Sequence, residues 1–246
     1  MDRRDFFKAA GGSILLAASG AYAFQFLTAP SKAWTKIAAQ TAGRKWGMLI
    51  DLTKCPPDCD ACIQACRQEN NVAFLGDKRW DVHWIRKVNL KPAIGGRGAE
   101  KQAILLCNHC DKPPCAQVCP VQATYKRPDG IVIVDHHRCI GCRYCMIACP
   151  YNARFFNFKD CEDWPNKDYP KRSHGVAESC NLCVHRLDKG LLPACVEKCQ
   201  AIGAGALMVG DINDPESDIY RAIAAGGVRR LKEDLGTEPK VYYIGL

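Results

Sequence analysis

The sequence predicts an α+β fold of short strands, short helices and loop insertions. Seventeen of the 246 residues are cysteines, far more than in an ordinary soluble protein, and sixteen of them form four groups that share one spacing. Short runs of β-branched and aromatic residues flank these groups at 46–52, 131–134 and 240–244. Two further segments, 74–98 and 154–178, are long enough to be loop insertions that contact partner proteins.

Composition limits the size and class of the protein. With 48% apolar and 24% charged residues, the chain is globular and long enough for one substantial domain or two small ones. Its formal net charge of +8 is spread along the chain without a polybasic run. We therefore expect no nucleic-acid partner.

The N-terminus resembles a twin-arginine export signal. Residues 1–8 contain a paired arginine followed by two phenylalanines and a lysine, directly ahead of the apolar run 9–27. A transmembrane helix is the alternative, but glycines and serines make this run weakly apolar and it is barely long enough. We expect 1–23 to be the signal, either cleaved after the small residues at 21–23 or retained as an anchor. This route carries folded, cofactor-loaded proteins, which suits a cysteine-rich chain.

The grouped cysteines have the spacing of iron–sulfur ligands. In every group three residues separate the third and fourth cysteines. The third group, followed by Pro150, reads C-x2-C-x2-C-x3-C-P, in which three thiolates bind one cluster and the fourth binds its neighbour. The four groups are Cys55, Cys59, Cys62 and Cys66; Cys107, Cys110, Cys115 and Cys119; Cys139, Cys142, Cys145 and Cys149; Cys180, Cys183, Cys195 and Cys199.

The spacing also predicts local structure around each group. Four helical positions rise about 6 Å and stay on one face, so we expect the third and fourth cysteines to lie on a helix and bracket two adjacent clusters. The first two cysteines are expected in turns, where Gly141 would let backbone amides face a cluster. Residues 119–123 and 149–153 repeat the pattern Cys-Pro-x-x-Ala, which indicates duplicated units. Residues 125–130 predict a hairpin turn into the strand at 131–134.

Other uses of cysteine fit less well. Disulfides would leave one of seventeen cysteines unpaired, and C-x2-C is too short for most relaxed bridges. Zinc would close each site with four ligands and leave the shared spacing unexplained. No C-x2-C pair is followed by histidine, so we expect no covalently attached haem.

Residues outside this pattern carry weaker signals. Cys161 lies outside every group and is expected to be a buried spare thiol. The six histidines show no catalytic or metal-binding spacing. Arginines 67, 138, 143 and 186 lie beside grouped cysteines, where they either raise cluster potentials or form a solvated surface.

Four such groups, including the run from Cys139 to Pro150, resemble the four-cluster ferredoxin-type electron-transfer subunits of membrane respiratory complexes. The resemblance covers 45–246 and is nearest to DsrO of the DsrMKJOP complex. It implies two interleaved bacterial dicluster-ferredoxin-like units with loop insertions. The outer unit comprises 45–75 and 179–246, and the inner unit comprises 103–158.

The resemblance also implies four [4Fe–4S] clusters, because the first group pairs with the fourth and the second with the third. The implied ligand sets are set A, Cys55, Cys59, Cys62 and Cys199; set B, Cys66, Cys180, Cys183 and Cys195; set C, Cys107, Cys110, Cys115 and Cys149; and set D, Cys119, Cys139, Cys142 and Cys145.

The function implied is electron transfer without catalysis in this chain. A DsrO-like subunit would conduct electrons between an integral quinone-interacting subunit of the NrfD or DsrP type and a multihaem cytochrome c of the DsrJ type. It would lie on the extracytoplasmic (periplasmic) face of the cytoplasmic membrane, associated with it through the complex. The alternative is the electron-transfer subunit of a molybdopterin oxidoreductase such as tetrathionate or polysulfide reductase.

Overall fold

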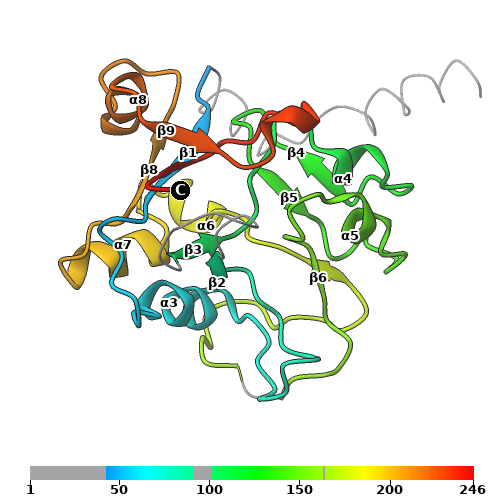
Figure 1. Ribbon diagram of the computed structural model, residues 1–246. Helices are drawn as coiled ribbons and strands as arrows, with labels where there is room; N and C mark the ends of the chain where they lie inside the picture. The colour runs from blue at the N-terminus through cyan, green and yellow to red at the C-terminus, as the bar shows by residue number, and fades with distance from the viewer. Residues whose placement is uncertain (1–42, 91–100, 163) are drawn as a thin grey trace, which may run out of the picture. The chain divides into compact units, whose positions relative to one another are not determined.

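The first and last strands of the described chain pair with each other. The computed structural model describes residues 43–90, 101–162 and 164–246 (Figure 1). The expected export signal lies outside these residues. Residues 43–246 form one compact unit of mixed α and β structure, and no helix within the described residues has the length and apolar character needed to span a bilayer.

A four-stranded sheet forms one side of this unit (Figure 1). β1 (Trp46–Asp51) runs parallel to β10 (Val241–Ile244), and the outer strands β8 (Leu207–Asp211) and β9 (Val228–Arg230) run antiparallel to their neighbours. The strand order is β8-β1-β10-β9. Both strands expected at the ends of the cysteine-rich region are thereby confirmed.

The sheet forms because its central strands are buried. Met48, Leu49 and Ile50 are consecutive buried residues, so both faces of β1 are covered. Val241 and Tyr243 alternate with less buried neighbours, so only one face of β10 reaches the core. Between β8 and β9 lies α8 (Asp218–Ala224), and a short 3₁₀ turn, η1 (Glu233–Leu235), follows β9.

Three short hairpins complete the β structure. β4 (Thr124–Lys126) pairs with β5 (Val132–Val134), which confirms the predicted turn and strand. β2 (Arg86–Leu90) pairs with β3 (Lys101–Leu105), so part of the expected loop 74–98 is a strand. The third hairpin joins β6 (Phe155–Phe156) to β7 (Ala177–Glu178).

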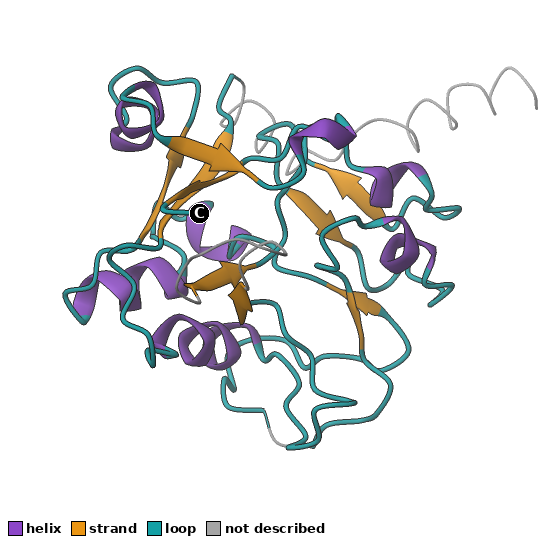
Figure 2. Cartoon of the chain, in the orientation of Figure 1, coloured by secondary structure: helices purple, strands orange, loops and turns teal. Residues whose placement is uncertain are grey.

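Four of the described helices pack in two pairs (Figure 2). α3 (Ala61–Asn70) packs on α7 (Ala194–Ala201), which brings the first and fourth cysteine groups together. α4 (Pro114–Gln117) packs on α5 (Tyr144–Ala148), which does the same for the second and third groups. The remaining helix, α6 (Val184–Leu187), follows Cys183 directly.

The expected placement of the third and fourth cysteines on one helix is correct only for α3 and α7. Cys62 and Cys66 lie within α3, and Cys195 and Cys199 lie within α7. α4 ends at Gln117, and α5 ends at Ala148, so the fourth cysteine of each lies outside the helix. In both cases a proline comes next, and it disfavours helical backbone in the residue before it.

The two predicted insertions pack against each other in their described parts. The rings of Trp80 and Phe158, one from each insertion, lie edge to face with their centroids 5.6 Å apart. The indole N–H of Trp84 donates to Glu178 Oε2 at 3.1 Å.

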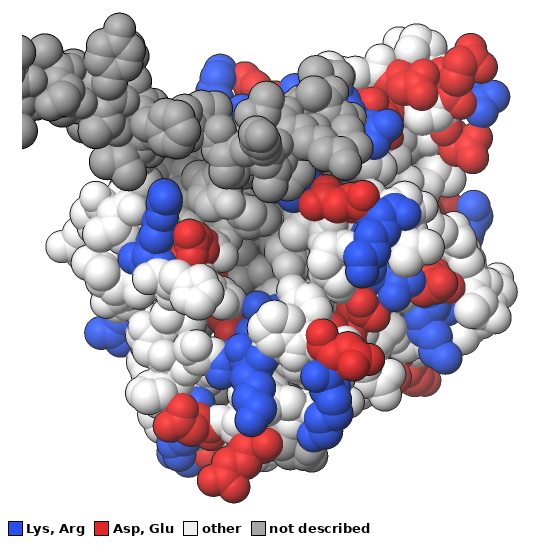
Figure 3. All heavy atoms as spheres, turned by 180° about the vertical axis from the view of Figure 1, so that it is seen from behind, with Lys and Arg blue, Asp and Glu red and all other residues white. Residues whose placement is uncertain are grey.

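On the face seen from behind, basic and acidic side chains are interspersed rather than segregated (Figure 3).

Asp111 connects three strand ends through lysines. It pairs with Lys45 ahead of β1, with Lys126 at the end of β4 and with Lys240 ahead of β10. Burial alone would raise the pKa of the Asp111 carboxyl, but the three ammonium groups lower it to about 2. Lys240 is itself buried and also donates to the Gly130 carbonyl oxygen at 2.6 Å.

We predict that Asp111→Asn destabilises the fold by about 1–3 kcal/mol, because the buried Lys240 loses its counter-charge. Thermal unfolding at neutral pH measures the effect. Asp218→Asn is the control, since Asp218 forms only an exposed pair with Arg221, and such pairs contribute about 0–1 kcal/mol. Equal unfolding temperatures for the two variants would contradict this role of Asp111.

Candidate iron–sulfur sites

The sixteen grouped cysteines differ in how far they are buried. Every cysteine of sets B and C is buried, whereas each of sets A and D has members that water reaches. In set A, Cys55 and Cys59 are half-buried; in set D, Cys142 is exposed. The protein therefore encloses the two middle sets and opens the two others toward its surface.

Sets A and C each surround a cavity. Cys55, Cys59, Cys62 and Cys199 line one cavity together with apolar residues that include Ile104 and Leu207. The four cysteines of set C line a second cavity, where Val132, Tyr151 and Arg154 complete the wall. In each case three cysteines come from one group and the fourth from a group distant in the sequence.

Sets B and D are brought together in the same way. Burial raises the pKa of Cys66 well above its ordinary value, and the nearby Cys180, Cys195 and Cys183 add to the rise. In set D, burial raises the pKa of Cys145 to about 11, with contributions from Cys139 and Cys119 among its neighbours. Cys142 lies in the same loop as Cys139, at its exposed end.

The sets follow one another in space in the order A, B, C, D. Cys195 of set B lies near enough to Cys62 of set A to feel its charge. Cys180 of set B stands in the same relation to Cys107 of set C. Cys115 of set C in turn adds to the raised pKa of Cys145 of set D. Any two neighbouring sets thus have at least one pair of cysteines close enough for the charge of one to affect the pKa of the other.

Backbone N–H groups point at cysteine sulfurs in all four sets. The donors reach Sγ at 3.3–3.5 Å: Ala206 to Cys199, Leu182 to Cys180, Ala153 to Cys149, Thr124 to Cys119 and Ala177 to Cys139. Such bonds stabilise negatively charged sulfur and tune a metal site. The sequence analysis expected amides to face a cluster around the first two cysteines of a group, and of these five bonds those to Cys180 and Cys139 involve such a cysteine.

Matching turns follow the second and third groups. Gln122 and Asn152 occupy equivalent positions in the repeated Cys-Pro-x-x-Ala segments, with φ of 52° and 49°. Each donates its backbone N–H to the carbonyl oxygen of the cysteine three residues earlier, at 3.2 and 3.3 Å. The sequence repeat is therefore also a repeat of backbone conformation. After each turn a backbone N–H donates to the sulfur of the preceding cysteine, from Thr124 five residues after Cys119 and from Ala153 four residues after Cys149.

The sulfur environments fit an iron–sulfur cofactor. Burial raises the pKa of Cys62 and of Cys107 to about 12, so these thiols would stay protonated near neutral pH without a positive partner. Among the described residues, no three His, Cys, Asp or Glu side chains are placed to ligate a single metal ion. Four cysteines around one cavity suit a [4Fe–4S] cluster, which supplies one-electron redox chemistry when bound.

Two polar residues at the sulfurs were missed by the sequence analysis. Arg154 is buried and places Nη2 3.1 Å from Cys115 Sγ. Asn70 is buried at the end of α3 and places Nδ2 3.4 Å from Cys183 Sγ. Arg154 follows the repeated segment 149–153 directly, which was the available signal. Asn70 lies four residues after Cys66 and so on the same helix face.

The arginines singled out from the sequence have other direct partners, although the charge of Arg67 acts on Cys66 and that of Arg186 on Cys183. The Arg67 guanidinium stacks on Phe74 at 3.9 Å, and that of Arg143 lies 5.5 Å from the Phe156 ring. Arg138 pairs with Asp135, and Arg186 pairs with Glu69 and Glu197. Cys161 is half-buried against the core rather than fully buried.

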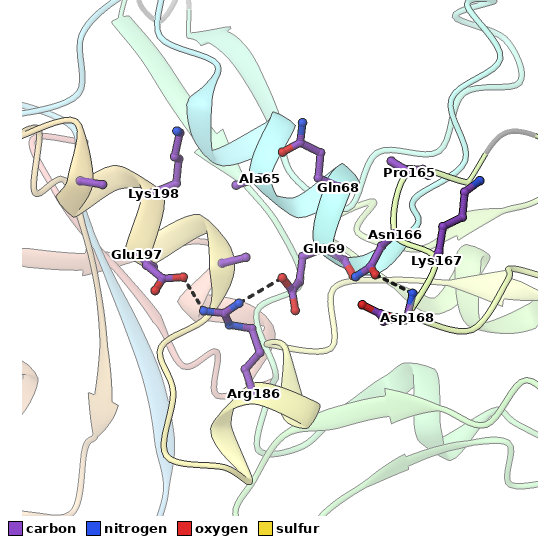
Figure 4. A pocket seen from close by; sticks show the side chains of 12 residues that line it. Ala65, Gln68, Glu69, Pro165, Asn166, Lys167, Asp168, Arg186, Glu197 and Lys198 are labelled. Carbon is purple, nitrogen blue, oxygen red and sulfur yellow. Dashed lines mark hydrogen bonds and ion pairs between the residues drawn. The ribbon is translucent and has the colours of Figure 1, made fainter.

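A larger hollow lies on the outer side of α3 and α7 (Figure 4). Arg186 bridges Glu69 and Glu197 across it. None of its twelve lining residues is a cysteine. The hollow is therefore distinct from the cysteine-lined cavities.

These features define an iron–sulfur protein of the ferredoxin type, and comparison with known proteins agrees. Residues 103–212 match the family model described as a 4Fe-4S dicluster domain. The chain is 41% identical over 279 aligned positions to the Hdr-like menaquinol oxidoreductase iron-sulfur subunit 1 of Archaeoglobus fulgidus, covering 100% of this chain and 98% of that relative.

Two further relatives match most of the chain. A tetrathionate reductase subunit of Salmonella typhimurium is 42% identical, covering 82% of this chain and 73% of its own length. The menaquinone reductase iron-sulfur cluster-binding subunit of Nitratidesulfovibrio vulgaris is 38% identical, covering 81% and 88%. The chain belongs to the family of iron–sulfur electron-transfer subunits of membrane-associated oxidoreductases. It is an electron-transfer subunit and not a catalytic one.

We predict that Gly141→Ala prevents cofactor assembly at set D and lowers iron content by about four atoms per chain. Gly141 has φ of 72°, and a Cβ there would collide with the Gly175 carbonyl oxygen. Iron analysis of the purified protein measures the loss. Gly190→Ala is the control, because Gly190 has φ of 75° with open space around it. Equal iron content in both variants would show that the close approach at Gly141 is not required.

Proposed function

We propose that this chain is a DsrO-like subunit that conducts electrons through four [4Fe–4S] clusters, held by sets A to D. Its partners are an integral quinone-interacting subunit of the NrfD or DsrP type and a multihaem cytochrome c of the DsrJ type. The observation that carries the proposal is the continuous series of four cysteine sets. The middle sets B and C are buried, and the end sets A and D include half-buried or exposed cysteines.

This arrangement suits conduction rather than catalysis. The fully buried sets B and C are shielded from solvent, where reduced iron–sulfur groups would react with other molecules. Sets A and D reach the surface, where electrons can be exchanged with partners. Around Cys142 the side chains of Ile140, Tyr144 and Ile147 are exposed and apolar, as expected of a surface that a partner protein covers.

The domain organisation proposed is two interleaved ferredoxin-like units. The packing of α3 on α7 supports an outer unit from 45–75 and 179–246, and the packing of α4 on α5 supports an inner unit from 103–158. The proximity of Cys180 in set B to Cys107 in set C would allow electrons to pass from one unit to the other. Four clusters, two in each unit, follow from this organisation.

The relatives support a quinone-linked role. The relative that matches all of this chain is named as a subunit of a menaquinol oxidoreductase, and a third relative as a subunit of a menaquinone reductase. The twin-arginine pattern in 1–8 supports a location on the extracytoplasmic (periplasmic) face of the cytoplasmic membrane. The proposed link to sulfur metabolism follows from the DsrO-like assignment.

The second candidate is the electron-transfer subunit of a molybdopterin oxidoreductase. It is favoured by the 42% identity to the tetrathionate reductase relative. The two candidates differ in their partners and in metal content, and not in the chemistry of this chain.

The deciding experiment is purification of the native complex in mild detergent, with mass spectrometry of its subunits and molybdenum analysis. We expect a polytopic membrane subunit and a multihaem cytochrome c without molybdenum. A large molybdenum-containing partner would contradict the DsrO-like assignment and establish the second candidate.

We predict that Cys145→Ser abolishes quinol-linked electron transfer through the complex, because Cys145 is the buried member of set D. The measurement is quinol-dependent reduction of the partner by the purified complex. Cys161→Ser is the matched control, since Cys161 belongs to no set, and it should retain turnover. Full turnover by Cys145→Ser in a complex that lacks the set D cluster would refute conduction through this site.

A further inference from the structure

Arg154 is a buried positive charge whose side chain lies at the cysteine sulfurs. The residue is 4% exposed, and its guanidinium places Nη2 3.1 Å from Cys115 Sγ and Nη1 3.4 Å from Thr124 Oγ1. Arginine keeps its proton in proteins, so the charge is permanent. A buried charge is costly unless an opposite charge compensates for it.

No carboxylate provides that compensation within the described part of the chain. The comparison is Arg127, which is 6% exposed and pairs with both Asp129 and Asp188. Arg154 forms no such ion pair among the residues described, and the groups that act on its charge are Cys115, Cys107 and Cys145. The counter-charge available to Arg154 is therefore the thiolate sulfur that these cysteines would carry as cluster ligands.

Arg154 lies near cysteines of two different sets. Cys107 and Cys115 belong to set C, and Cys145 belongs to set D. Arg154 Nη1 also lies 3.4 Å from Thr124 Oγ1, and the backbone N–H of Thr124 donates to Cys119 of set D at 3.5 Å. Arg154 therefore lies between these two sets and acts on each.

In set B the side chain at the sulfurs is a neutral amide. Asn70 donates from Nδ2 to Cys183 Sγ at 3.4 Å and reaches Cys66 Sγ at 3.9 Å, both in set B. An amide donates a hydrogen bond without adding net charge. Cations also act on sets A and B, including Lys87 on Cys62 and Arg186 on Cys183. Both are less buried than Arg154, and Arg186 is paired with Glu69 and Glu197. The full burial of the cation is what distinguishes sets C and D.

We propose that the fixed positive charge of Arg154 raises the reduction potentials of the two clusters at sets C and D. Arg154 would thus influence electron transfer without itself carrying electrons. The inference rests on the proposed function, since it requires clusters at both sets. Reduction adds one electron and no proton, so it raises the negative charge of the site by one. A permanent cation in a water-poor environment favours that more negative state.

The consequence is a difference between the two halves of the electron path. Arg154 makes sets C and D better electron acceptors than the same ligands would be without it. Electrons that enter at set A are thereby drawn toward set D. Exposed arginines such as Arg143 have less influence, because solvent screens their charge.

The test is a redox titration followed by electron paramagnetic resonance on the purified complex. Arg154→Gln and Arg154→Met remove the charge, Arg154→Lys keeps it, and Arg143→Gln is the control. Signals are assigned with Cys142→Ser for set D and Cys59→Ser for set A. We expect lower midpoint potentials at sets C and D in the neutral variants, near wild-type values in Arg154→Lys, and smaller shifts at set A and in the control.

Unchanged midpoint potentials in the neutral variants would overturn the inference. If a neutral variant loses the two clusters, the iron content of Arg154→Lys decides between the explanations. Iron retained in Arg154→Lys supports a role for the charge. An equal loss of iron in Arg154→Lys refutes that role. A wild-type complex without clusters at sets C and D would contradict the proposed function as well. Unchanged potentials in the neutral variants of a complex with four clusters would contradict the inference alone.

Discussion

The structure depends on keeping negatively charged sulfur stable away from water. Eleven of the sixteen grouped cysteines are buried, and burial raises the pKa of thiols such as Cys62 and Cys107 to about 12. Thiolates persist in such places only where other groups replace the lost hydration. The chain supplies sets of four cysteines that suit iron, backbone N–H groups aimed at Sγ, and the guanidinium of Arg154.

The irregular architecture follows from this requirement. Helices of four or five residues and turns with positive φ at Gln122 and Asn152 serve to orient N–H groups and sulfurs, which long regular elements would not do. Stability has to come from elsewhere. The β1–β10 sheet and the lysines around Asp111 hold together segments far apart in the sequence, so the cysteine-bearing loops are fixed in place.

The sequence predicted the strands from local pattern, misplaced the ends of two helices, and missed a side chain that only tertiary contact brings to the sulfurs. The strands at 46–52, 131–134 and 240–244 were recognisable from composition, and Gly141 from its place between two ligands. The ends of α4 and α5 were missed because the effect of Pro120 and Pro150 was not weighed against the helical spacing. Arg154 was missed because only folding brings it to Cys115, thirty-nine residues earlier in the chain.

The central claim is that one chain holds four [4Fe–4S] clusters in series. Quantification of iron and acid-labile sulfide per chain, on anaerobically purified protein, tests it most directly. Four clusters require about sixteen iron and sixteen sulfide per chain. About eight of each would mean that only two of the four cysteine sets are occupied, and the continuous path from set A to set D would not exist.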